Sequence, residues 1–81
     1  MNDEEVIQLI KNLREEFKKR FPNKSDEERD NMILDVFFEA FCRKQIDRQD
    51  LTTLTIAMGH EVNNEVLDQL ESEMKGAKNN D

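Results

Sequence analysis

Two side chains in this sequence have the chemistry for nucleophilic or metal-assisted catalysis, and each type occurs once. Cys42 is the only cysteine and His60 the only histidine. Cys42 follows Phe41 in an apolar stretch, where thiols are usually unreactive, and nothing in the spacing brings His60 beside it. The sequence has no glycine-rich phosphate loop and no paired Cys and His ligands for zinc. We therefore predict a protein that is not an enzyme and that has neither a cofactor nor a metal.

A set of carboxylates has the spacing of one helix face. Glu61, Glu65 and Asp68 are separated by four and three residues, and Glu71 lies beside them on the same face. Residues 46–81 contain eight acids and three bases, so they carry −5 of the total charge of −7. Acids of like sign steer association with a basic partner. This face is a candidate protein-binding site, and the alternative is a solvated outer surface.

The same region also loosely resembles a helix-turn-helix, carried by residues 55–59 and 62–71 with two additional residues in the turn. DNA contacts come mainly from Arg and Lys. The second helix would instead bring Glu65 and three further acids before its first base, Lys75. We therefore rank DNA binding third. An acidic mimic of nucleic acid, which blocks the basic groove of a DNA- or RNA-binding protein, ranks second.

Helices must position these side chains, because apolar residues recur at helical spacings and the sequence contains no strand pattern. Asn2 is the expected cap of a first helix over residues 3–21, which the only proline ends. Ser25 and Glu28 form a capping box at the start of a second helix over residues 26–45. The first two helices thus form a long hairpin.

Two shorter helices are predicted after this hairpin. Asp47 caps the third, over residues 48–58, and Gly59 suits the left-handed position that follows a helix end. Asn63 caps the fourth helix, which ends near Lys75. The predicted fold is therefore all-α, a small four-helix bundle.

The length of 81 residues suits one domain. We assign residues 1–75 to that domain and predict a disordered tail over residues 76–81. No apolar run approaches the roughly 18 residues that span a bilayer. The acidic start does not resemble a signal peptide, so we expect a cytoplasmic protein.

The second helix is apolar over about 240° of its circumference, which makes it the expected centre of the core. If the other helices leave part of it uncovered, Leu34 and Phe38 are exposed together with Ile56 of the third helix. Such an apolar face would bind a protein partner or form a homodimer. The alternative is that the other three helices cover it and these are ordinary core residues.

Residues 46–70 resemble the exiting helix of an EF-hand, the linker and the entering helix of the next hand. The matching residues are Ile46, Asp50, Leu51, Met58, Gly59, Val62, Glu65 and Leu67, and the run FFEAF at 37–41 is similar to an entering helix. The calcium loop is missing, because only four residues separate Phe41 from Ile46 where an EF-hand needs a loop of about 12 residues with oxygen ligands. Two of those four, Arg43 and Lys44, are cations. We predict no calcium site.

These observations favour a non-enzymatic protein-protein interaction module, a small acidic intracellular regulator or inhibitor. Its predicted partner is a protein, of basic character if the acidic face binds it. A membrane partner is not expected, and nucleic acid is disfavoured by the charge.

Overall fold

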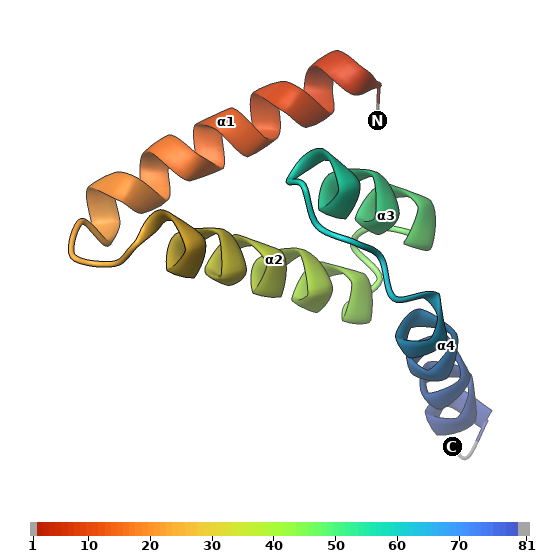
Figure 1. Cartoon of the computed structure of the whole chain (residues 1–81). Helices are drawn as coiled ribbons and strands as arrows, with labels where there is room; N and C mark the ends of the chain where they lie inside the picture. Colours follow the sequence, from red (N-terminus) through yellow and green to blue (C-terminus); the bar gives the residue numbers. More distant parts are fainter. Residues whose placement is uncertain (1, 80–81) are drawn as a thin grey trace.

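The computed structural model describes residues 2–79, with side chains to residue 74. Within this part the chain forms four helices and no strand, so the predicted all-α bundle is confirmed. The helices are α1 (Asp3–Arg20), α2 (Asp26–Cys42), α3 (Arg48–Ala57) and α4 (Asn64–Asn79). α1 and α2 form a hairpin that opens like a V, α3 packs at its open end, and α4 projects away from α1 (Figure 1).

The starts of the first three helices are capped as the sequence predicts. The backbone N–H of Glu5 donates to the side chain of Asn2 at 2.8 Å. Ser25 and Glu28 form the reciprocal capping box, in which each side chain accepts a hydrogen bond from the backbone N–H of the other residue. Asp47 accepts from the N–H of Asp50 at 2.8 Å. These caps satisfy N–H groups that have no partner within the helix.

α2 ends at Cys42, three residues before the predicted end at residue 45. The cause is Lys44, which adopts a left-handed conformation with φ of 62°. The backbone N–H of Lys44 donates to the carbonyl of Phe41, and that of Gln45 donates to the carbonyl of Ala40. This pair of bonds is a Schellman motif, which usually contains a glycine at the left-handed position. The lysine there gave the sequence no visible stop signal.

α3 ends in the same motif, here with glycine. Gly59 has φ of 83°, and its N–H donates to the carbonyl of Ile56 at 2.9 Å. The N–H of His60 donates to the carbonyl of Thr55 at 3.1 Å. The predicted left-handed role of Gly59 is confirmed.

α4 begins after Asn63, whose side chain accepts from the N–H of Val66 at 3.2 Å, as expected for a cap. The helix continues to Asn79, beyond the predicted end near Lys75, so it is nearly as long as α2. The backbone of residues 76–79 is therefore helical in this structure. Residues 80–81 lie outside the described residues, and a disordered tail stays a prediction.

The core is built from one stripe of each helix. In α2 the buried apolar residues are Ile33, Phe37 and Phe41, spaced by four residues along one face. α2 is not covered on every side, because Val36 is 45% exposed. The other buried apolar residues are Val6, Ile10, Leu51, Leu54, Met58 and Leu67. Leu67 is the buried residue of α4 in this cluster, and Leu70 and Met74 of the same helix pack against it.

Candidate protein-binding surfaces

The predicted acidic face is divided by an arginine from the neighbouring helix. Arg48, in the first turn of α3, pairs with Asp68 of α4 and donates to Glu71 at 3.1 Å. Its second terminal nitrogen donates to the backbone carbonyl and side chain of Asn64 at 3.3 and 3.2 Å. The hydrogen bond with Asp68 raises the pKa of Arg48 above its ordinary value. Two of the four predicted site acids thus hold α3 against α4.

The other two acids of this face remain directed to solvent. Glu61 and Glu65 are exposed and line a shallow depression with Val62, Asn63 and Asn64. Neither forms an ion pair with a described residue. The accessible negative surface around the start of α4 therefore rests on two carboxylates, with Asp68 and Glu71 partly neutralised beside them.

The predicted apolar face does not form one surface in the structure. Leu34 and Phe38 are half-buried and pack against the core cluster. Ile56, by contrast, is 61% exposed. It lines a depression between α1 and α3, and neither Leu34 nor Phe38 is part of that lining. The lining residues are Asp3, Val6, Ile7, Thr53, Ile56 and Ala57.

Ile7 is the residue that the sequence analysis missed. It lies next to Val6 but outside the buried stripe of α1, and it is 65% exposed. A second depression continues from the first, since both are lined by Ile7 and Ala57, and it extends along α1 over Ile10, Lys11, Arg14 and Glu15. We call this continuous surface, centred on Ile7, Ile56 and Ala57, the α1–α3 seam. The sequence did contain a signal for this surface, because Ile7 is a large apolar residue that lies outside the apolar stripe of its helix.

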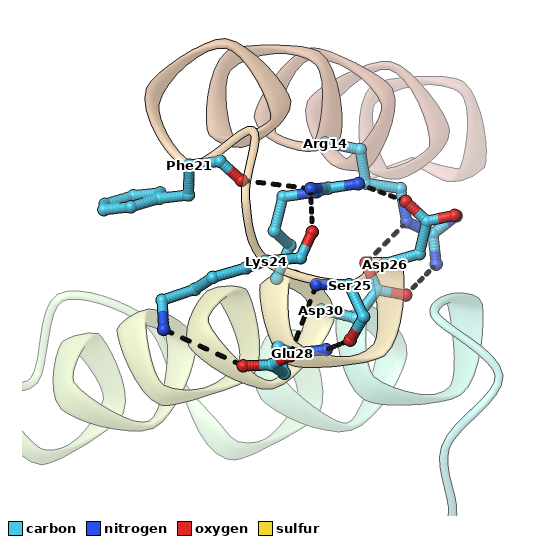
Figure 2. A network of polar contacts seen from close by, with 8 residues as sticks. Arg14, Phe21, Lys24, Ser25, Asp26, Glu28 and Asp30 are labelled. Carbon is cyan, nitrogen blue, oxygen red and sulfur yellow. Dashed lines mark hydrogen bonds and ion pairs between the residues drawn. The ribbon is translucent and has the colours of Figure 1, made fainter.

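A polar cluster at the tip of the α1–α2 hairpin has a different character (Figure 2). The side chain of Arg29 is buried there and donates to the carbonyls of Phe21, at 3.0 Å, and Lys24, while it also pairs with Asp26. The depression beside it is lined by three bases and three acids: Arg14, Lys18, Arg29, Glu15, Asp26 and Asp30. This cluster fastens the turn, and its lining is balanced in charge.

Cys42 and His60, the two candidates for catalysis, do not interact with each other in the structure. Cys42, expected in apolar surroundings, is exposed at the last residue of α2, because the buried stripe ends one position earlier at Phe41. Its side chain and that of His60 make no hydrogen bond with a described residue. Among the described residues no group of three His, Cys, Asp or Glu side chains could hold a metal ion. None of the described helices is long and apolar enough to cross a membrane.

Comparison with known proteins adds no relationship. No protein-family model matches the chain, and neither a curated protein nor a solved structure is significantly similar to it.

Proposed function

We propose that this chain is a non-enzymatic protein-interaction module, a small acidic regulator of the cytoplasm that binds a protein through the α1–α3 seam. The observation that carries the proposal is the pair of exposed isoleucines, Ile7 and Ile56, which line one continuous depression on two helices. Adjacent large apolar side chains at a surface favour a protein partner over water.

The backbone under the α1–α3 seam is fixed by core packing in the unbound protein. Val6, beside Ile7, is 2% exposed, and Leu54 and Thr55 fix the α3 side in the core. Thr55 additionally donates its hydroxyl to the carbonyl of Leu51 at 2.7 Å. Because the backbone beneath the isoleucines is ordered by packing, a partner would meet a preformed surface and little conformational entropy would be lost on binding.

Affinity capture from the source cells tests the proposal with a matched pair of variants. Ile56→Glu places a charge in the seam and should abolish capture of the partner. Val66→Glu, at an exposed valine of α4 outside the seam, should not. Capture by the wild type should persist at about 1 M salt, where the Debye length is only about 3 Å. Circular dichroism confirms that both variants are folded.

Capture that is insensitive to Ile56→Glu would contradict the proposal. If capture were instead lost in high salt and on changing Glu61 and Glu65 to Gln, the acidic mimic of nucleic acid would be the better function. The pairing of Arg48 with Asp68 and Glu71 lowers the support for that alternative, because half of the predicted acidic face is already engaged.

A further inference from the structure

One acid and one base on the exposed side of α1 are placed symmetrically about Ile7. Asp3 lies four residues before it and Lys11 four residues after it, so each is about 6 Å from Ile7 along the helix axis. Beyond Lys11 the seam is lined by Arg14, which is paired with Asp30, and by Glu15. Within four residues of Ile7, the lining of the seam on α1 therefore carries Asp3 on one side and Lys11 on the other.

The charges of one α1 helix are complementary to those of a second α1 helix only when the two helices run in opposite directions. Two α1 helices packed antiparallel about Ile7 would bring Asp3 of each copy to the level of Lys11 of the other. A parallel arrangement would place acids against acids and bases against bases. Neither Asp3 nor Lys11 forms an ion pair with a described residue, so both are available for such contacts.

We infer that the protein bound by the α1–α3 seam is a second copy of this chain, in a two-fold dimer with antiparallel α1 helices. The inference rests on the proposed function, since it names the partner of the same surface. Ile7 and Ile56 of both copies form the apolar centre, and the pairs of Asp3 with Lys11 form the rim. Such a self-complementary patch is the usual form of a two-fold interface.

The alternative surface for self-association is α2, where Val36 is the most exposed large apolar residue. The charge pattern distinguishes the two surfaces, because α2 shows no comparable ordering of acids and bases about Val36: Asp35 lies before it and Glu39 after it. The positions four residues before and after Val36 hold Met32 and Ala40, so two antiparallel α2 helices would form no acid–base pairs there. The seam is the surface that the charges favour.

Sedimentation equilibrium of the full chain, up to about 100 µM, gives the first measurement. A dissociation constant of micromolar order leaves mostly dimer at that concentration. Ile7→Glu should give a folded monomer, and Val36→Glu, the matched control on α2, should remain dimeric. A monomeric wild type, a dimeric Ile7→Glu variant or a monomeric Val36→Glu variant would each overturn the inference.

Charge reversal tests the antiparallel geometry. Asp3→Lys and Lys11→Asp should each weaken the dimer by roughly tenfold or more, because two attractive rim contacts become repulsive. An equimolar mixture of the two variants should restore a dimer, since each rim contact between the two different chains then joins a lysine to an aspartate again. Lys19→Asp, the same change elsewhere on α1, is the control. Single variants that dimerise like the wild type, or a mixture that stays monomeric, would overturn the inference.

The proposed function can fail separately from this inference. A monomeric wild type whose partner capture is still abolished by Ile56→Glu would refute the dimer and leave the interaction module intact. A monomeric wild type whose capture ignores Ile56→Glu would refute both.

Discussion

Arg29 and Arg48 each join neighbouring helices, and they do so in opposite environments. Arg29 at the α1–α2 turn is 7% exposed and donates mainly to backbone carbonyls. Arg48 at the α3–α4 junction has a side chain that is 33% exposed and bonds two carboxylates, Asp68 and Glu71. The first contact belongs to the fixed part of the fold. The second lies at the surface, where water and salt compete with it.

The difference shows that an arginine contact between two helices can be costly to break where it is buried and easily exchanged for water where it is exposed. A buried guanidinium that loses its partners leaves donors and acceptors unsatisfied, which is costly. An exposed pair can exchange its partners for water at little cost. The α3–α4 junction therefore depends on the apolar residues of α4, Leu67 with Leu70 and Met74, and Arg48 is a reinforcement that salt can weaken. The hairpin tip depends on Arg29 itself.

The largest effect that separates the two junctions is expected from Arg29→Met. The methionine keeps much of the aliphatic stem but removes the donors to Phe21 and Lys24, so the free energy of unfolding should fall by about 2–3 kcal/mol. The loss should be the same at low and high salt, because a buried contact is screened little. Urea denaturation at two salt concentrations measures it.

Arg14→Met is the matched control for this measurement. Arg14 also joins α1 to α2, through a bidentate pair with Asp30, but its side chain is 45% exposed. Arg14→Met should lower the free energy of unfolding by about 0–1 kcal/mol. A larger loss for Arg14 than for Arg29 would show that burial does not govern these contacts.

A smaller effect is expected at the left-handed ends of α2 and α3. Gly59→Ala should lower the free energy of unfolding by about 1 kcal/mol, because a side chain is disfavoured at φ of 83° even though nothing lies within 4 Å of the added carbon. Lys44→Gly should raise it by up to about 1 kcal/mol for the same reason in reverse. Denaturant midpoints give both values. Changes of the same sign at the two positions would contradict this account.

These positions also show which parts of the fold could be predicted. Asn2, Ser25, Asp47 and Asn63 were identified as caps because a cap is a contact between residues three apart, which the sequence displays directly. Gly59 was identified because glycine is the usual left-handed residue. Lys44 gave no such signal, so α2 was extended three residues too far.

The candidate site was harder to predict because it depends on contacts between distant residues. Glu61, Glu65, Asp68 and Glu71 share a helix, but only the docking of α3 on α4 places Arg48, twenty residues before Asp68, against two of them. Ile56 was named as one of three residues, with Leu34 and Phe38, that would be exposed if the other helices left the apolar face uncovered, and of these only Ile56 is exposed. Ile7 was not named, because only the packing of α1 against α3 places it in the same depression as Ile56.

Arg48→Met tests the exposed contact at the α3–α4 junction. Its effect on stability should be smaller than that of Gly59→Ala. Removing the guanidinium frees Asp68 and Glu71, so the thermal midpoint should fall slightly at low salt. The difference from the wild type should vanish near 1 M salt, where charges are screened beyond about 3 Å. Arg43→Met, which removes an exposed pair with Glu39 inside one segment, is the control. A difference that persists undiminished in high salt would contradict the surface character of this contact.

The smallest expected effect is a pH dependence confined to the hairpin tip. The backbone N–H of Ser25 donates to the Glu28 carboxylate and holds the pKa of that group below its ordinary value of 4.5. A carboxyl whose pKa is lower in the folded state contributes stability above the unfolded value and loses it as the pH falls through the folded value. Glu28→Gln keeps an acceptor for Ser25 but does not titrate. The stability advantage of the wild type over this variant should therefore be constant above about pH 5 and shrink toward pH 3.

Glu27→Gln, beside Glu28 with no hydrogen bond to a described residue, should show no such change. Urea midpoints of the three proteins between these pH values provide the measurement, and an advantage that grows on acidification would reverse the assigned sign.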